Sequence, residues 1–238
     1  MQQSYRDSWH YNLRLLSTVI QRSLALEPRA DIPNALAIFP SGPLNEFLRI
    51  ISTLPEGATA LDAGGLVLTP LQQVLADAVC INTTRDELAQ NASCADVTVI
   101  FTRGTTEPGN GVEFPATFTG FNLNSTEGVP SMASFINQAI TSCPDSKILV
   151  PGHSQGALVV RSTTDSLPAD TMSKINSVVT FGDPKNQTAI TGAESKILVI
   201  CHENDAVCSG GFITVDHLTY ADNATTAAQF VVEKAGGE

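Results

Sequence analysis

The chain has 238 residues, of which 42 % are hydrophobic and 16 % charged, enough apolar material for one sizeable core. Its formal net charge of −11 disfavours nucleic acid as a partner, because clustered basic side chains bind that polyanion. No stretch approaches the roughly 18 consecutive apolar residues of a membrane span, and no internal repeat suggests a solenoid.

The first 81 residues differ in pattern from the rest of the chain. Residues 1–10 are polar and lack the apolar core of a signal peptide. Apolar side chains recur at helical spacing over 43–51 and 70–79, and a Gly/Ala-rich connector over 56–65 separates the two stretches. We therefore predict an N-terminal extension or pro-segment over 1–81, with amphipathic helices, that precedes a main domain over 82–238.

Strand-like and helix-like stretches alternate through the main domain. Four apolar runs of strand length occupy 96–102, 147–151, 177–182 and 196–201. Helical patterns occupy 130–142, 155–167 and 223–234. This alternation predicts an α/β fold with a mainly parallel central sheet flanked by helices.

The most informative stretch is Gly152-His-Ser-Gln-Gly156, which follows the apolar run 148–150 and precedes a helical pattern. It matches the G-x-S-x-G nucleophile elbow, where a sharp strand-to-helix turn lifts a serine hydroxyl above the end of a sheet. Glycines at 152 and 156 let the strand and the helix approach each other closely. The bland alternative is a small serine in an ordinary Gly-rich turn. The flanking strand and helix favour Ser154 as a nucleophile.

A serine nucleophile needs a histidine base. The four histidines are His10, His153, His202 and His217. His10 lies in a polar stretch and His153 is bonded directly to Ser154, so neither is well placed to reach the serine hydroxyl. The chain order of α/β-hydrolases, which is serine, acid and then histidine, leaves His202 or His217 as the base.

Seven carboxylates lie between Ser154 and His217, and the predicted strand ends narrow the choice. Catalytic groups of parallel α/β sheets lie at the carboxyl ends of the strands. Asp205 follows the apolar run 196–201, and Asp183 follows the run 177–182. We favour Asp205 as the acid, with Asp183 as its rival.

Four blocks, taken in order, resemble the fungal cutinase family of the α/β-hydrolase superfamily over roughly residues 82–235. The blocks are Thr84-Arg-Asp-Glu-Leu88 with Cys94, Phe101-Thr-Arg-Gly-Thr-Thr-Glu-Pro-Gly-Asn110, Ser142-Cys-Pro-Asp145 with the elbow, and Cys201-x3-Asp205-x2-Cys208 with His217-Leu-Thr-Tyr220. One position departs from the pattern, since the family more usually has Tyr where His153 stands.

The resemblance implies a role for each matching residue. Ser154 corresponds to the nucleophile, Asp205 to the acid and His217 to the base. The backbone N–H groups of Thr105 and Gln155 correspond to the oxyanion hole, which the Thr105 hydroxyl is expected to assist. His202 has no catalytic counterpart. The family needs no cofactor, and no Cys/His cluster in the chain has metal-ligand spacing.

The resemblance also implies two disulfides, Cys94 with Cys143 and Cys201 with Cys208, which leave Cys80 unpaired. Disulfides favour an oxidising compartment. Five N-x-S/T sequons agree with export, at Asn82, Asn91, Asn124, Asn186 and Asn223. We therefore expect a secreted protein, although no signal peptide is visible in the chain.

One departure from the family is large. After Pro108-Gly-Asn110, cutinases continue through a long helix and another strand, whereas here Gly111-Val-Glu-Phe-Pro115 follows at once. A parallel crossover needs about a dozen residues or more, so one helix–strand unit is missing, from the protein itself or from an incomplete sequence. If the missing strand is the edge of the sheet, the remaining strands still form a contiguous sheet. Apolar surface is then uncovered, the oxyanion loop loses support, and the N-terminal extension becomes a candidate cover or flap.

The expected function is that of a secreted, monomeric serine esterase. It would hydrolyse cutin-type polyesters and short acyl esters through an acyl-enzyme. An acetylxylan esterase, acting on an acylated polysaccharide, is the enzymatic alternative. The shape of the acyl pocket would separate the two, with Leu218 and the run 212–215 as candidate wall residues. A secreted surface-binding protein, catalytically impaired by the missing unit, is the alternative from another class.

Overall fold

The computed structural model describes residues 57–78, 86–109, 112–211, 213–214 and 216–236. The helix predicted over 43–51, the unpaired Cys80 and the sequon at Asn82 lie outside these ranges, as do Phe212 and Val215 of the predicted pocket wall. Within the described part of the chain, no helix is both long and apolar enough to cross a lipid bilayer.

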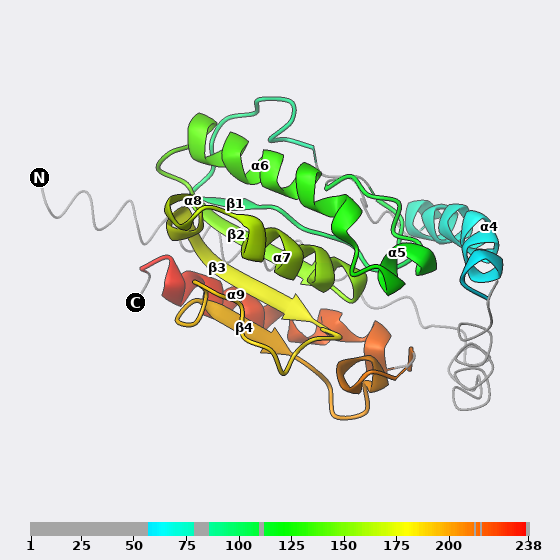
Figure 1. Cartoon of the computed structure of the whole chain (residues 1–238). Coiled ribbons are helices and arrows are strands. Elements are labelled where there is room, and N and C mark those ends of the chain that lie inside the picture. The colour runs from blue at the N-terminus through cyan, green and yellow to red at the C-terminus, as the bar shows by residue number, and fades with distance from the viewer. Residues whose placement is uncertain (1–56, 79–85, 110–111, 212, 215, 237–238) are drawn as a thin grey trace, which may run out of the picture. The chain divides into compact units, whose positions relative to one another are not determined.

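Four parallel strands form the central sheet, and their spatial order follows the sequence (Figure 1). The strands are β1 (Val97–Val99), β2 (Lys147–His153), β3 (Ile175–Phe181) and β4 (Ile197–Ile200). Each pairs with its neighbour in the chain, for example Val99 with Leu149 and Val179 with Leu198. The contiguous parallel sheet confirms the predicted fold class.

Helices cover both faces of this sheet, because successive strand side chains point to opposite sides. On one face, Val150 of β2 lies in a core cluster with Ile136 of α6 (Val129–Ser142) and Val159 of α7 (Gln155–Ser166). On the other face, Val179 of β3 packs with Val231 of α9 (Ala224–Lys234). Figure 1 shows α6 and α7 on one side of the strands and α9 on the other.

Short elements complete the described fold. They are α5 (Phe118–Asn122), α8 (Ala169–Lys174) and the 3₁₀ turns η1 (Thr126–Gly128), η2 (Ala206–Ser209), η3 (Asp216–Leu218) and η4 (Tyr220–Asn223). The last three turns follow β4 and bring the C-terminal loops to the carboxyl edge of the sheet. Catalytic and ligand-binding groups of parallel sheets gather at this edge.

The sheet ends at β1, and exposed apolar side chains lie on β1 and just beyond it. Val99 is 56 % exposed and Phe101 is 45 % exposed. Since strand side chains project from the faces of a sheet, this exposure agrees with the loss of the crossover helix, whereas loss of the edge strand leaves the other strands contiguous.

Helix α4 (Gly57–Ala78) corrects one sequence-based prediction. The segment 56–65 was expected to be a connector, but the helix already begins at Gly57. Contacts with the main domain explain this: Asp62 accepts hydrogen bonds from the N–H groups of Phe118 (2.5 Å) and Thr119 (3.2 Å) at the start of α5. Gly65 is buried so close to Thr106 that a Cβ atom would lie 3.1 Å from the threonine methyl. Packing therefore overrides the low helix propensity of glycine.

Both predicted disulfides are present. Cys94–Cys143 joins the segment before β1 to the end of α6, across 49 positions of sequence. Cys201–Cys208 closes a loop of seven positions after β4. Constraint of the unfolded chain by these bridges is worth about 4 and about 2–3 kcal/mol, respectively, in the loop-entropy description. The smaller bridge holds the loop that carries Asp205.

Candidate active site

Ser154 lies at a strained turn between β2 and α7. Its backbone has φ 55° and ψ −117°, a conformation that costs a non-glycine residue roughly 1–3 kcal/mol. A Cβ atom at Gly152 would lie 2.5 Å from the carbonyl oxygen of Gly156, and one at Gly156 would lie 2.2 Å from that of Thr102. Only glycine fits at either position. The turn is the predicted elbow, and the Ser154 N–H donates to the carbonyl of Phe181 at 2.8 Å.

Asp205 and His217 form a buried pair at the same edge of the sheet. His217 Nδ1 lies 2.7 Å from Asp205 Oδ2, and the two residues are 1 % and 2 % exposed. Since a carboxylate accepts the Nδ1 hydrogen, Nε2 is the basic nitrogen of the ring. This Nε2 is buried and has no hydrogen-bond partner among the described residues. It is therefore available to take a proton from a hydroxyl group.

The electrostatic surroundings keep His217 in its basic form. Burial lowers the pKa of His217 below its ordinary value, and it outweighs the opposing effect of the hydrogen bond that Nδ1 donates to Asp205. Asp205 in turn is held by the N–H of Val207 at 2.9 Å and by the hydroxyl of Tyr220, which donates to Oδ2 at 2.6 Å. Sequence reasoning did not find this role of Tyr220, although the residue lies in the block that contains His217.

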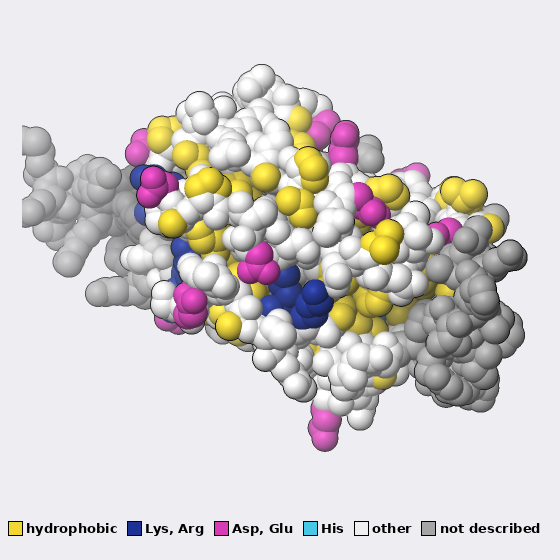
Figure 2. Space-filling view, in the orientation of Figure 1, with side chains coloured by type: hydrophobic (Ala, Val, Ile, Leu, Met, Phe, Trp, Pro, Cys, Tyr) yellow, Lys and Arg dark blue, Asp and Glu magenta, His cyan; other side chains and the backbone are white. Residues whose placement is uncertain are grey.

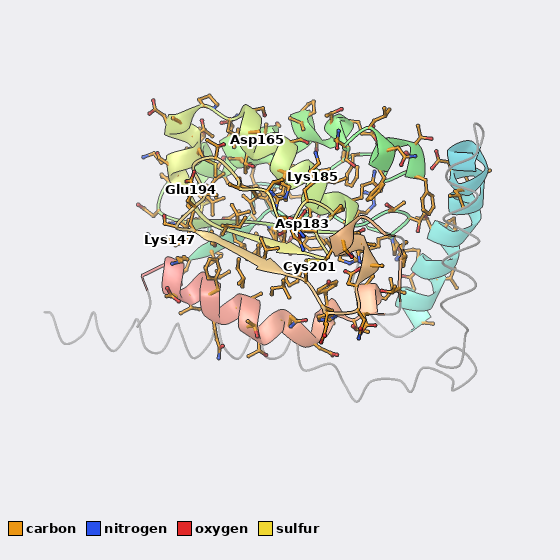
Figure 3. All side chains as sticks on the ribbon, turned by 60° about the horizontal axis from the view of Figure 1, so that its bottom comes forward. Lys147, Asp165, Asp183, Lys185, Glu194 and Cys201 are labelled. Carbon is orange, nitrogen blue, oxygen red and sulfur yellow. A yellow bond between two sulfur atoms is a disulfide. The ribbon has the colours of Figure 1, made fainter. Side chains whose placement is uncertain are left out.

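The rival acid Asp183 is occupied elsewhere. Its carboxylate is fully buried and accepts from the Nε of Arg161 at 2.8 Å and from the N–H of Lys185 at 2.9 Å. Figure 3 shows Asp183 beside Lys185, just beyond the end of β3. Asp183 thus completes a structural ion pair, and among the described residues it forms no hydrogen bond or ion pair with a histidine.

His202 also lies outside the Asp205–His217 pair. Its ring stacks on Tyr220 with centroids 4.2 Å apart, and its Nδ1 lies 2.9 Å from the carbonyl oxygen of Asp216. Its Nε2 faces the side chain of Asn223 at 2.5 Å. With both ring nitrogens engaged, His202 packs behind Tyr220 and cannot serve as the base.

The two residues predicted for the oxyanion hole are in contact with each other. Thr105 follows β1 and donates its hydroxyl hydrogen to Gln155 Oε1 at 2.8 Å, while Gln155 begins α7 and is fully buried. This bond fixes the loop after β1 against the helix N-terminus, where backbone N–H groups and the helix dipole favour an anion. The expected part of the Thr105 hydroxyl in the oxyanion hole stays a prediction, and in this structure the hydroxyl donates to Gln155 Oε1.

A second acid–histidine pair, Glu107 with His153, adjoins this site. Glu107 Oε1 lies 2.7 Å from His153 Nδ1, and His153 Nε2 lies 3.0 Å from the carbonyl oxygen of His217. Sequence reasoning set His153 aside because of its place next to Ser154. The departure from the Tyr usual in the resembled family, together with an acid in the oxyanion loop, was the signal that could have found the pair.

Two further features of the described residues bear on where a ligand could bind. No group of three or more His, Cys, Asp or Glu side chains among the described residues is arranged to hold a metal ion. A hollow of about 330 Å³ lies at the amino-terminal ends of β2 and β3, lined in part by Lys147, Lys174 and Asn176, and so at the edge opposite Ser154. On the face in Figure 2, acidic side chains are scattered singly among apolar ones.

Comparisons with known proteins agree on one family. The model of the cutinase family matches residues 109–235. The cutinase cut1 of Trichoderma harzianum is 38 % identical over 216 residues, covering 79 % of this chain and 85 % of that protein. A cutinase of Hypocrea jecorina is 36 % identical over 217 residues, with the same coverage.

A solved structure of a Trichoderma reesei cutinase in complex with a phosphonate inhibitor superposes with a TM-score of 0.69. It is 34 % identical, and the match covers 81 % of this chain and 98 % of that one.

The alignment with the T. harzianum protein contains gaps on the side of this chain, because its 216 positions exceed 79 % of 238 residues. A missing crossover unit would produce such gaps.

Proposed function

The chain belongs to the cutinase family, a family of carboxylic ester hydrolases, and on that premise we propose that it is a secreted serine esterase acting through Ser154, His217 and Asp205. One observation carries the proposal. The basic Nε2 of His217 is buried and unpaired, while its Nδ1 is held by a carboxylate. A buried polar atom without a partner costs free energy, and catalysis explains why it is kept.

The first half of the proposed reaction forms an acyl-enzyme. The Ser154 oxygen attacks the ester carbonyl carbon as His217 Nε2 accepts the hydroxyl proton. Asp205 holds the imidazole tautomer and stabilises the imidazolium that forms. The backbone N–H groups of Thr105 and Gln155 donate to the carbonyl oxygen as it becomes negative, and each such donor is worth about 3–4 kcal/mol in the transition state. His217 then protonates the departing alcohol, which leaves the acyl group on Ser154.

The second half repeats these roles with water. His217 Nε2 takes a proton from the water as its oxygen attacks the acyl carbon, and the same N–H groups stabilise the new oxyanion. Collapse of this intermediate expels the serine oxygen, which regains its proton from His217. The acid product is released and the free enzyme is restored.

We propose cutin-type polyesters and short acyl esters as substrates. Leu218, directly after the base, is 67 % exposed and offers an apolar surface to an aliphatic chain. An acetylxylan esterase needs to accommodate only a two-carbon acyl group beside a polar sugar, which makes that apolar surface harder to explain. The impaired binding protein is disfavoured by the buried Asp205–His217 pair, which a decayed site would not be expected to retain.

Secretion is supported by the two disulfides, which persist in oxidising compartments. Of the predicted sequons, Asn91 and Asn124 are exposed and have positive φ angles typical of turns. Both are accessible to glycosylation. By contrast, Asn186 donates to Cys201 Sγ and Asn223 faces His202, so these two side chains are engaged within the fold.

The test is hydrolysis of p-nitrophenyl butyrate by the purified chain, combined with labelling by a fluorophosphonate. We expect turnover and labelling in the wild type, and loss of both in Ser154→Ala. Ser173→Ala serves as the matched control, since Ser173 is exposed on α8, its hydroxyl donates to the carbonyl of Asp170, and it lies at the opposite edge of the sheet from Ser154. A folded wild type that neither turns over nor accepts the label would overturn the proposal in favour of the binding protein.

A further inference from the structure

The Glu107–His153 pair contacts the ring and the backbone of His217, the base of the proposed mechanism. The rings of His153 and His217 have centroids 4.8 Å apart, and His153 Nε2 meets the backbone carbonyl of His217. The side chains of His153 and Glu107 are 13 % and 33 % exposed. Neither lies on the Nε2 of His217, which has no partner. The pair therefore touches the base without blocking the atom that moves the proton.

The two partners of His153 determine its protonation. A backbone carbonyl can only accept, so Nε2 of His153 carries a hydrogen. Nδ1 faces the carboxylate of Glu107, whose other oxygen already accepts the N–H of Gly104 at 2.6 Å. A hydrogen on each ring nitrogen satisfies both contacts. Burial alone would lower the pKa of His153, but the hydrogen bond and charge of Glu107 outweigh it and raise that pKa.

The same pair reaches the oxyanion loop and the elbow. Glu107 lies in the loop after β1, and its Oε2 holds the N–H of Gly104, the residue directly before Thr105. His153 is the last residue of β2, directly before Ser154. A single ion pair thus joins three segments that meet at the carboxyl edge of the sheet: the oxyanion loop, the elbow and the loop of the base.

We propose that Glu107 and His153 are positioning residues, which fix His217 relative to the oxyanion loop by holding the carbonyl of His217 and the N–H of Gly104 at once. The proposal rests on the proposed function, because it assigns His217 as the base. It also explains how the oxyanion loop is held in place in a chain that lacks the crossover unit expected beside this loop. The charged pair supplies part of the support that this unit would have given.

The charges around His217 predict a change in the pH profile that a loss of stability alone would not produce. The titratable groups that face His153 and His217 are Glu107 from the oxyanion loop, Asp205 from the loop before η2 and Tyr220 from η4. The positive charge of His153 opposes protonation of His217, whereas Asp205 and Glu107 favour it. Replacing His153 by a neutral residue removes the only opposing charge among these groups. The acid limb of the pH profile must then move to higher pH.

The experiment compares His153→Phe, Glu107→Gln and the double variant with the wild type. Phe keeps the ring volume but has no N–H donor, and Gln keeps the shape of Glu without its charge. Glu113→Gln is the matched control, since Glu113 is exposed and its side chain lies outside the site. The readouts are kcat and KM for p-nitrophenyl butyrate, the pH profile of kcat/KM, the fraction labelled by fluorophosphonate and the thermal melt.

We expect kcat to fall about 10- to 100-fold in each single variant, as for a displaced catalytic group, with KM changed less than about twofold. The double variant should be no worse than the worse single variant, because the two residues act as one unit. The acid limb of His153→Phe should move to higher pH. A folded, fully labelled His153→Phe enzyme with wild-type kcat and an unmoved limb would overturn the proposal.

A measurement on the wild type tests whether His153 is charged, even if the variants fold poorly. Histidine ¹⁵N NMR should show a titration midpoint for His153 above the ordinary value of 6.5. A midpoint at or below that value would refute the charged pair. Failure of the proposed function is distinguishable, since the wild type itself would then show neither turnover nor labelling.

Discussion

Asparagine substitutions at Asp183 and Asp205 should separate the two carboxylates that the sequence left as rivals. Both side chains are buried and both follow strands of the sheet. Asp183 pairs with a buried arginine, whereas Asp205 pairs with the ring of His217. The first substitution should therefore damage stability, and the second should damage catalysis.

For Asp183→Asn, the magnitude follows from the arginine that is left behind. Arg161 is 4 % exposed, and its Nε donates to both oxygens of Asp183, at 2.8 and 3.0 Å. Breaking a buried pair by removing one charge costs about 3–5 kcal/mol, since the other charge stays desolvated. At about 2–4 °C per kcal/mol for a chain of this size, the melting temperature should fall by about 6–20 °C. The kcat of the folded protein should stay within about threefold of the wild type.

For Asp205→Asn, the amide oxygen can still accept from Val207, but the amide nitrogen at the Oδ2 position cannot accept the hydroxyl hydrogen of Tyr220. Loss of that bond costs about 1–3 kcal/mol, so the melting temperature should fall less than in Asp183→Asn. An amide N–H facing His217 Nδ1 selects the wrong tautomer, which places the hydrogen on Nε2. The comparable change in a serine protease lowers kcat about 10⁴-fold, or about 5.4 kcal/mol in the barrier.

The assay is a thermal melt of each variant beside p-nitrophenyl butyrate turnover per folded molecule. Asp165→Asn, an exposed position on α7, controls for the chemical change itself. Wild-type turnover in a folded Asp205→Asn, or a 10⁴-fold loss in a folded Asp183→Asn, would reverse the assignment of the acid.

Three further predictions follow from the same geometry. Burial lowers the pKa of His217, and the proposed base must be unprotonated, so kcat/KM should fall with decreasing pH only below pH 6.5. A pH–rate profile in which kcat/KM already falls above pH 6.5 on the acid side would contradict this. Removal of the Cys94–Cys143 disulfide by paired serine substitutions should lower the melting temperature more than removal of Cys201–Cys208, because it closes the longer loop. Removal of Cys201–Cys208 should lower kcat more, because its loop carries the proposed acid Asp205. In a release assay, a cutin-like polyester should be hydrolysed faster than acetylated xylan, and the opposite ranking would favour the acetylxylan esterase.

The elbow and the sheet could be predicted from the sequence because their causes are local. The apolar run before Gly152 defines β2, and the glycines at 152 and 156 are required by contacts within or just beside the turn. The predicted helices at 130–142, 155–167 and 223–234 agree with α6, α7 and α9 to within one residue at each end. Their periodic patterns have no competing interpretation.

What the sequence could not supply depends on contacts between distant residues. The sequence favoured Asp205 but left Asp183 as a rival acid, because the pairing of Asp183 with Arg161, 22 positions away on α7, has no local signature. Glu107 and His153 are 46 positions apart, and no local pattern connects them. The helical state of 57–65 likewise depends on Asp62 and Gly65 contacting a part of the domain some 40 or more positions further along the chain.

The conformation of Ser154 sets a trade-off between durability and activity. A residue with φ 55° and ψ −117° is held against its own preference by the sheet and by α7, so the native state contains strain that the unfolded chain does not. Glycine at this position would relieve that strain, and the resulting chain should resist heat better while losing the proposed nucleophile. Selection for thermal resistance alone would therefore tend to remove the elbow serine, and under the proposed mechanism its retention trades stability for turnover.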